Sequence, residues 1–555
     1  MISCIAIIAT SCSKKLNPLT ADLFTANPSP LEVVGTKVPV TISGQIPAKW
    51  FKKNAELTIT PVLKYDGGEA LGTSFYYQGE KVSGNGIVVP EATGANITMS
   101  SQFDYIPAMN KSELYLRFNA SLKGKSITLP DVKIADGVVA TAALADAFTN
   151  NLSIAPDKFQ KNVQEAYDAE IMFLIQQAEL RSSELNSDNL DAWKKLVADA
   201  DSDAKKKVNV EVSAYASPDG GQKLNDALAE KREGNTTNYL QKEFKKNKIN
   251  PDITAHYTAQ DWDGFKKLIE ASSLQDKGLI LNVLSMYSDP AEREREIKNI
   301  SAVYKEIAET ILPKLRRSRL TANVEVIGKT DDELNAAVTK DMSSLTVEEL
   351  LYAASIAKTS AEKEKIYSYV TSKFPNDYRG WNNLGTIYLQ QGLVDKANQA
   401  LTKASQLNSK APESNVNQAL IALSQNNTTK AEQLLGNGAG ASSLNEALGL
   451  LSLKKGEYSK AVQSFGDAKT NNAALAQILN KDYSKAQKTL DAVASKDART
   501  YYLDAIVASR TNNAAGVVSG LKQAIKLDPS LKSSALSDLE FAKYLTNPDI
   551  LNMLK

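Results

Sequence analysis

Residue types that commonly carry out covalent or metal chemistry are scarce in this chain. Among its 555 residues there is one histidine, His256, and there are two cysteines, Cys4 and Cys12. A zinc site of histidine and cysteine, a cysteine nucleophile in the body of the chain and a Ser–His–Asp triad without His256 are therefore excluded. General acid–base catalysis would need a pair of carboxylates, and no spacing singles one out. We predict that the protein is not an enzyme and uses no metal and no cofactor.

One stretch combines charged and small residues in a pattern typical of a binding loop. "AYASPDGGQKLNDALAEKRE", residues 214–233, runs from a Val-rich strand through a glycine-rich turn into a helix. Apolar residues recur there at the spacing of one helical face, which predicts a buried stripe of Leu224, Ala227, Leu228 and Leu240. The candidate site residues of this stretch are Ser217, Asp219, Gly220, Asn225 and Arg232.

This strand, turn and helix resemble the OmpA-like, peptidoglycan-associated domain. Counted from Ser217, the chain has Gly220, Asn225, Leu228 and Arg232 at the offsets of that family's pattern. The first position departs from the pattern, because the family has Asp where this chain has Ser217. The later strands "DITAHYTAQ" and "LRRSRLTANVEVIG" also fit. The resemblance implies an OmpA-like α/β-sandwich domain over residues 160–335, with a helical insertion at 262–312 that simple members lack.

The resemblance also implies a ligand. In that family, the Asp and the Arg recognise the diaminopimelate of the wall peptide, since a zwitterion needs a carboxylate for its ammonium and a guanidinium for its carboxylate. Arg232 could supply the guanidinium, whereas Ser217 has no charge, and Asp219 is the candidate substitute. Losing one ion-paired hydrogen bond costs about 1.5–3 kcal/mol. The sequence leaves two alternatives open. Either the domain still binds peptidoglycan weakly, or it is a degenerate scaffold that no longer binds it.

The C-terminal part of the sequence predicts stacked helix pairs. "WNNLGTIYLQQGLVDKANQALTKASQLN" resembles a tetratricopeptide repeat, with small Gly385 and Ala397 where two helices approach closely. Weaker copies extend this pattern to about six units, which predicts a TPR solenoid over residues 343–555. Its concave face is made largely by the first helix of each pair, where Asn and Arg could bind an extended partner peptide by its backbone. The candidate groove residues are Arg379, Asn382, Thr386, Gln390, Arg499 and Tyr502.

The N-terminal part of the sequence predicts strands. "LEVVGTKVPVTISGQIP" and "AELTITPVLKYDGG" alternate apolar and polar residues and are rich in Val, Ile and Thr. Turn residues such as Asp66-Gly67-Gly68 separate the strands at intervals of about ten residues. We predict an immunoglobulin-like β-sandwich over residues 25–145 that carries no chemistry of its own.

The first twelve residues, "MISCIAIIATSC", resemble a lipobox, with small residues before Cys12. The resemblance implies a signal segment over residues 1–12 and a lipid anchor on Cys12. Basic residues directly after Cys12, with no acidic residue before Asp22, favour the periplasmic side of the outer membrane. No other segment approaches the ~20 apolar residues of a transmembrane helix.

The charge balance bears on partners: 65 basic and 64 acidic residues leave a net charge of +1, so we expect no binding to nucleic acid. The predicted fold is multi-domain α+β, and the whole arrangement resembles Bacteroidota outer-membrane-associated lipoproteins. We therefore expect a periplasmic scaffold that binds partner proteins through its repeats and is held at the outer membrane by its lipid. The alternative is a dedicated accessory subunit of an outer-membrane assembly or secretion machine with no wall binding.

Overall fold

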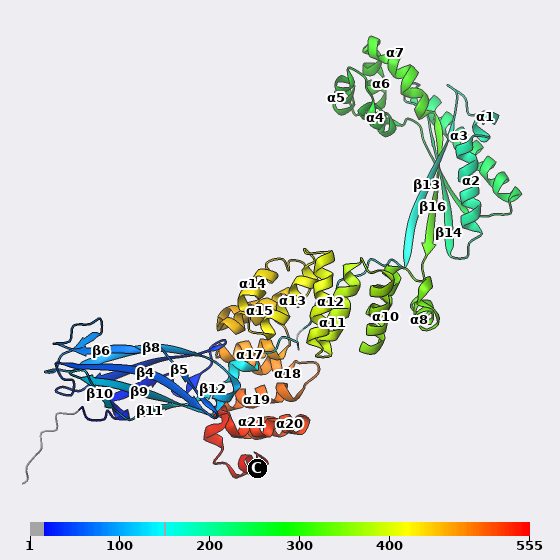
Figure 1. Ribbon diagram of the computed structural model, residues 1–555. Helices are drawn as coiled ribbons and strands as arrows, with labels where there is room; N and C mark the ends of the chain where they lie inside the picture. Colours follow the sequence, from blue (N-terminus) through cyan, green and yellow to red (C-terminus); the bar gives the residue numbers. More distant parts are fainter. Residues whose placement is uncertain (1–15, 149–150, 555) are drawn as a thin grey trace, which may run out of the picture. The chain divides into compact units, whose positions relative to one another are not determined.

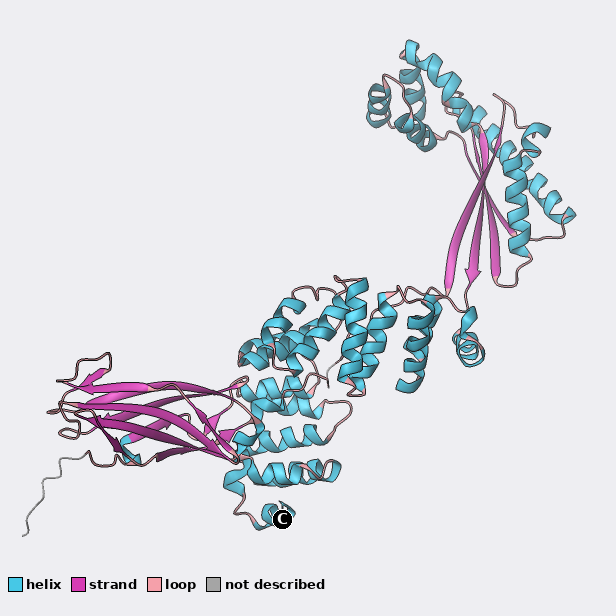
Figure 2. Cartoon of the chain, in the orientation of Figure 1, coloured by secondary structure: helices cyan, strands magenta, loops and turns pink. Residues whose placement is uncertain are grey.

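The computed structural model describes residues 16–148 and 151–554. The chain forms two compact units (Figures 1 and 2): unit 1 comprises Met1–Asp157 and Ala357–Lys555, and unit 2 comprises Lys158–Ile356. The predicted lipobox segment 1–12, with Cys12, lies outside the described residues. Within those ranges, no helix combines the length and the apolar character that crossing a bilayer requires.

The N-terminal part of unit 1 consists of β-strands. They are β1 (Phe24–Asn27), β2 (Leu31–Glu32), β3 (Lys37–Ile46), β4 (Ala55–Tyr65), β5 (Gly68–Leu71), β6 (Phe75–Gly79), β7 (Ile87–Val89), β8 (Ala95–Asp104), β9 (Ser112–Leu122), β10 (Lys125–Thr128), β11 (Val132–Asp136) and β12 (Val138–Val139). One sheet has the order β1-β3-β8; the larger one follows β10-β9-β4-β6-β7, with β11 on β9 and β5 on β4. Alternate residues of β3 and β8, such as Ile42 and Met99, are buried in the common core. The predicted β-rich N-terminal region is confirmed.

The C-terminal part of unit 1 consists of helices. They are α10 (Ser360–Lys373), α11 (Tyr378–Gln390), α12 (Val394–Leu407), α13 (Pro412–Ser424), α14 (Thr428–Leu435), α15 (Leu444–Lys455), α16 (Tyr458–Phe465), α17 (Asn471–Leu479), α18 (Tyr483–Asp491), α19 (Ala498–Arg510), α20 (Ala514–Leu527), α21 (Leu531–Ser537) and α22 (Pro548–Leu554). From α11 to α20, consecutive helices pack in pairs around one continuous core. A Cβ on Gly449 would lie 2.7 Å from the Phe465 ring, so only glycine permits this approach of α15 and α16. The predicted helical repeats are confirmed.

The strands and helices of unit 1 are joined by direct contacts. The Tyr458 hydroxyl, at the start of α16, accepts a hydrogen bond from the Gly35 N–H (3.2 Å) and lies 3.4 Å from the Val33 carbonyl oxygen. Thr141, just after β12, donates to the Glu540 carboxylate. These bonds fix the β-sandwich against the repeats within one unit.

Unit 2 is built around a four-stranded mixed sheet. Its elements are β13 (Asn162–Met172), α1 (Ser182–Leu185), α2 (Asp188–Asp201), β14 (Lys206–Tyr215), α3 (Gln222–Lys246), β15 (Asp252–Thr258), α4 (Trp262–Ala271), α5 (Lys277–Met286), α6 (Pro290–Asn299), α7 (Ser301–Thr310), β16 (Arg317–Ile327), α8 (Asp331–Lys340) and α9 (Val347–Ile356). The strand order is β13-β16-β14-β15, with β14 and β15 parallel and the other pairs antiparallel. Helices α2 and α3 bury the apolar residues of one sheet face, and α4–α7 form a second small core.

The predicted apolar stripe of helix α3 is wrong over its first two turns. Leu224 is 52% exposed and Ala227 is also exposed. The buried face instead begins with Asn225, Ala229 and Arg232. The physical reason is that the helix uses polar side chains there to satisfy the carbonyl groups of neighbouring loops, which an apolar stripe could not do.

Candidate functional site

The concave side of the helical repeats holds a segment of this chain. Beyond β12, residues 146–148 and 151–156, here called the groove segment, run along the first helices of the repeats (Figure 1). Asn417 of α13 accepts a hydrogen bond from the Ser153 N–H (3.0 Å) and donates to the Ser153 carbonyl (2.7 Å). Asn383 of α11 binds both groups of Ala155 in the same way (2.8 and 3.0 Å). Paired bonds of this kind fix the main chain of the segment.

A third asparagine repeats this arrangement further along the groove. Asn472 of α17 accepts from the Asp146 N–H (3.2 Å) and donates to its carbonyl (2.6 Å). Arg499 of α19 donates to the Asp146 carboxylate (3.2 Å) and to the Asn472 side-chain oxygen (3.1 Å). Burial lowers the pKa of Arg499, and the Asp146 carboxylate opposes this shift. The groove therefore pairs its partly buried cation with a carboxylate of the segment.

The candidate groove residues divide into two groups. Asn382 and Thr386 are fully buried and both donate to the Ser153 carbonyl (3.0 and 3.3 Å), and Arg499 binds Asp146 as described. Arg379 lies at the edge, bonded mainly to Asp377. The structure thus gives the predicted groove an occupant from within the chain, where we had expected a partner peptide.

Two of the candidate groove residues lie outside the groove contacts that the structure shows. Gln390 is exposed at the end of α11. Tyr502 donates to Asp538 (2.7 Å) and packs edge-on against Phe541, so it holds the C-terminal end of unit 1. Burial raises the pKa of Tyr502, which keeps the hydroxyl protonated as a donor. Neither residue contributes to the segment's binding.

The sequence reasoning missed Asn383, Asn417, Asn472 and Ser443, the last of which contacts Ser153 (Oγ to Oγ, 2.5 Å). A signal was available for two of them, because Asn383 and Asn417 are 34 residues apart, the length of one repeat. Polar residues that recur at the repeat period on the buried side of first helices indicate a common ligand. Asn472 comes after shortened repeats, so it does not lie at this 34-residue spacing.

The loop 217–220 of unit 2 is held by the side chain of Asn225. Its amide nitrogen donates to the carbonyls of Ser217 (3.0 Å) and Gly220 (2.8 Å). Gln260 also donates to the Gly220 carbonyl (2.9 Å). Asn225 is 4% exposed and begins the buried face of α3. Its role is to pin the turn onto the helix.

Arg232, which the sequence predicts to bind a ligand, is buried and bonded within the chain. The side chain is fully buried and donates to the carbonyls of Gln177 (2.9 Å), Tyr215 (2.8 Å) and Leu174 (3.2 Å). Its guanidinium also lies over a buried aromatic ring, 4.9 Å from the centroid. Burial and the nearby Arg316 lower the pKa of Arg232 to about 10. The guanidinium joins the loop after β13 to the end of β14 and presents no fork to solvent.

The remaining candidates of this loop are bonded to Arg316, the residue before β16. Arg316 donates to the Ser217 hydroxyl (3.2 Å) and to the Asp219 carboxylate (3.1 Å), and Ser217 itself donates to Asp219. Helices α4, α6 and α7 face the loop, leaving beside Pro218 and Asp219 a cavity of only about 10 Å³. That space is about the size of one water molecule.

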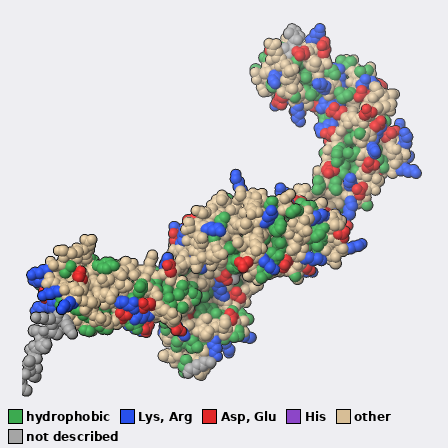
Figure 3. Space-filling model, viewed as in Figure 1, with side chains coloured by type: hydrophobic (Ala, Val, Ile, Leu, Met, Phe, Trp, Pro, Cys, Tyr) green, Lys and Arg blue, Asp and Glu red, His purple; other side chains and the backbone are tan. Residues whose placement is uncertain are grey.

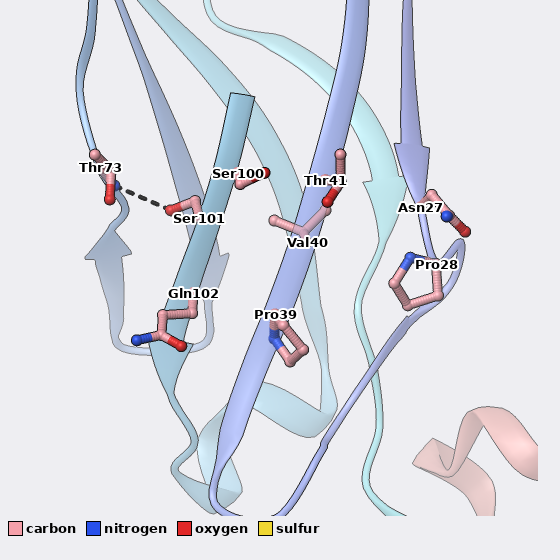
Figure 4. A pocket seen from close by; sticks show the side chains of 9 residues that line it. All are labelled: Asn27, Pro28, Pro39, Val40, Thr41, Thr73, Ser100, Ser101 and Gln102. Atoms are coloured by element: carbon pink, nitrogen blue, oxygen red, sulfur yellow. Dashed lines mark hydrogen bonds between the residues drawn. The ribbon is translucent and has the colours of Figure 1, made fainter. Parts of the chain in front are cut away.

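The β-sandwich also has a hollow on its surface. Figure 4 shows its side chains from the end of β1, from β3 and from β8, with the Ser101 hydroxyl accepting from the Thr73 N–H (3.0 Å). Its volume is about 430 Å³, and none of the nine lining residues is charged. It offers hydroxyl and amide groups and no titratable group for acid–base chemistry. Across the described parts of the chain, no group of three or more His, Cys, Asp and Glu could hold a metal ion.

Residues 378–410 match the sequence profile of the tetratricopeptide repeat. Among solved structures, a tetratricopeptide repeat protein from Parabacteroides merdae is 14% identical, covering 40% of this chain and 91% of its own, with a TM-score of 0.30. PilF of Pseudomonas aeruginosa is 18% identical; the match covers 39% of this chain and 100% of PilF, with a TM-score of 0.28. Yeast Tom70 is 11% identical; the match covers 59% of this chain and 77% of Tom70, with a TM-score of 0.27. A search of curated proteins finds no match. The profile match and the helix pairs support protein–protein interaction as the general function.

Proposed function

We propose that this protein is a non-enzymatic scaffold that binds partner proteins through its tetratricopeptide-type repeats. The observation that carries the proposal is the groove, in which side chains of α11, α13 and α17 hold the groove segment by its N–H and C=O groups. Main-chain recognition of this kind is a general way to bind a protein segment. Basic and acidic side chains are interspersed over the visible face of the repeats (Figure 3), so no single-sign patch favours nucleic acid.

Cross-linking followed by mass spectrometry in native membranes tests this proposal. A lysine-reactive cross-linker should join one partner protein, in a fixed ratio, to lysines of the repeats such as Lys403, Lys430 and Lys488. Lys123, on the β9–β10 turn of the sandwich, is the internal control. Cross-links that map to the sandwich and never to the repeats would contradict the proposal.

The protein's place in the cell is part of the same proposal: lipid attachment at Cys12, on the periplasmic side of the outer membrane. Its support is the lipobox-like "IIATSC" and the basic residues after it. Metabolic labelling with a palmitate analogue should modify the wild-type chain and Cys4→Ala, while Cys12→Ala should stay unlabelled. Equal labelling of both variants would remove the anchor from the proposal.

For unit 2 we propose an OmpA-like fold whose wall-binding site is closed. Support for the fold comes from strand β14 leading through the glycine-rich turn into α3, and from the paired Arg316 and Arg317 at the start of the last strand. Support for closure comes from the bonds of Arg232 and Asp219 within the chain. These bonds favour the accessory-subunit alternative, in which the protein serves an outer-membrane machine without touching the wall.

Sedimentation with purified peptidoglycan tests the closure. The wild-type chain should stay in the supernatant. Ser217→Asp should not change this, because Arg316 and Asp219 already form an ion pair with each other. A wild-type chain that pellets with peptidoglycan, and is released by Asp219→Ala but not by the exposed-site control Lys231→Ala, would show a working site.

A further inference from the structure

The groove of the repeats binds the main chain of the groove segment. Each of Asn383, Asn417 and Asn472 uses its amide oxygen and nitrogen on the N–H and C=O of a single residue. These pairs bind main-chain groups and require no particular side chain, as when a strand is added to a sheet edge. A second peptide could therefore replace the groove segment bond for bond.

Other contacts restrict the side chains that fit. Asp146 forms an ion pair with the partly buried Arg499 (3.2 Å). Ser153 is fully buried against the Ser443 hydroxyl, and Ala155 is 1% exposed, so both positions favour a small side chain. The segment thus defines a ligand pattern: a carboxylate, a small residue seven positions later, and another small residue two positions beyond that.

We propose that this groove is a peptide-binding site kept closed by the chain's own groove segment. Its external ligand is an extended segment of a partner protein with the same pattern of carboxylate and small residues. This inference rests on the proposed scaffold function and specifies how a partner reaches the repeats. A tethered ligand competes at an effective concentration on the order of 1 mM. If the groove segment binds with an intrinsic Kd of about 10 µM, it weakens the binding of a competing peptide by about 1 mM divided by 10 µM, which is about 100-fold.

Binding of a fluorescein-labelled peptide of residues 144–157, "LADAFTNNLSIAPD", to the full chain tests the proposal. An opened chain carries Asp146→Lys, which faces Arg499, and Ala155→Arg, which does not fit its buried position. Fluorescence polarisation should show about 100-fold tighter binding to the opened chain than to the wild type. Adding Asn417→Ala should weaken binding at least tenfold, whereas the exposed-site control Asn437→Ala should not. Opened chains that keep their helix content and thermal midpoint but bind no tighter would overturn the proposal.

A second measurement uses a chain close to the wild type, in case the opened chain does not fold. In Ser153→Cys, with Cys4 and Cys12 changed to serine, the single thiol is buried and should react slowly with a maleimide. The unlabelled peptide at about 1 mM should speed this reaction at least tenfold by holding the segment outside the groove. A peptide carrying Lys and Arg at the positions of Asp146 and Ala155 should have no effect. Equal rates with both peptides would overturn the proposal.

A disulfide separates failure of this inference from failure of the scaffold function. Ser153→Cys with Ser443→Cys should lock the segment in place, since the two hydroxyl oxygens are 2.5 Å apart. The oxidised chain should bind no peptide and should lose the partner cross-links to the lysines of the repeats, and reduction should restore both. Partner cross-links to the repeats that persist in the locked chain would refute the displaceable segment and leave the scaffold function intact.

Discussion

Replacing Arg232 by alanine tests whether this side chain holds the fold or binds a ligand. The buried guanidinium donates to three carbonyl groups, at 2.9, 2.8 and 3.2 Å. Hydrogen bonds from a charged donor contribute about 1.5–3 kcal/mol each, and part of this sum is offset by the cost of burying the charge. With three carbonyls left unpaired, we expect the free energy of unfolding of unit 2 to fall by about 3–5 kcal/mol.

Urea unfolding of the full chain, combined with hydrogen exchange, measures this effect. Trp193 and Trp262 report on unit 2, and the amides of the loop 174–177 should lose protection first, because Arg232 holds that loop. Lys231→Ala, the exposed neighbour, should change stability by less than about 0.5 kcal/mol. An Arg232→Ala chain as stable as the wild type that loses binding to peptidoglycan would refute the structural role.

Three further predictions concern single residues of both units. Gly449→Ala should destabilise the repeats by about 1–3 kcal/mol in thermal unfolding, because the new Cβ would meet the Phe465 ring at 2.7 Å. Gly234→Ala, in the interior of α3 with nothing within 4 Å, should instead stabilise unit 2 by up to about 1 kcal/mol; a loss there would reveal a contact that the structure lacks. Asp504→Asn tests a titration: burial raises the pKa of Asp504 despite a hydrogen bond from Gln487, so the ionised form destabilises the folded state. The variant should melt at a higher temperature at pH 7, and this advantage should shrink as the pH falls through the raised pKa, where the wild type gains its proton; an advantage unchanged down to pH 4 would contradict it.

The helical repeats could be predicted from the sequence because their code is local. Gly385 and Ala397 sit at fixed offsets within one helix pair, and the structure shows why: a Cβ on Gly385 would lie 2.8 Å from a side-chain carbon of Leu401. The strands of the sandwich were equally readable, since alternation and turn residues such as Gly67, at φ +84°, act within a few positions. Patterns within a few residues of the sequence were therefore enough to predict the helical repeats and the strands.

The occupant of the groove could not be predicted in this way. The groove segment falls between the predicted domain ranges 25–145 and 160–335, and "NNLSIAP" has neither helical nor strand periodicity. Its conformation depends on Asn417 and Asn383, which are more than 220 positions away along the chain. Nothing within the segment itself encodes these partners.

The bonding partners of the charged residues in unit 2 could not be predicted for a related reason. Arg232 occupies the position of a ligand-binding arginine, but its sequence offset is compatible with either a solvent-facing or a buried guanidinium. The choice is made by the carbonyls of the loop after β13 and of Tyr215, and the partner of Asp219 comes from Arg316 at the far end of the insertion. A motif fixes where a side chain starts, and tertiary contacts decide what it binds.

The two candidate sites share one property and differ in its consequence. In both, the polar groups suited to a ligand are already paired within the chain. In unit 2, Arg232 and Asp219 are bonded to loops that frame the sheet, so a ligand would have to break these bonds and replace them with bonds of another kind. In the groove, an incoming extended peptide restores the bonds that the groove segment gives up, so the exchange leaves no donor or acceptor unpaired. Because an unpaired buried polar group costs about 1–3 kcal/mol, exchange is feasible in the groove and unfavourable in unit 2.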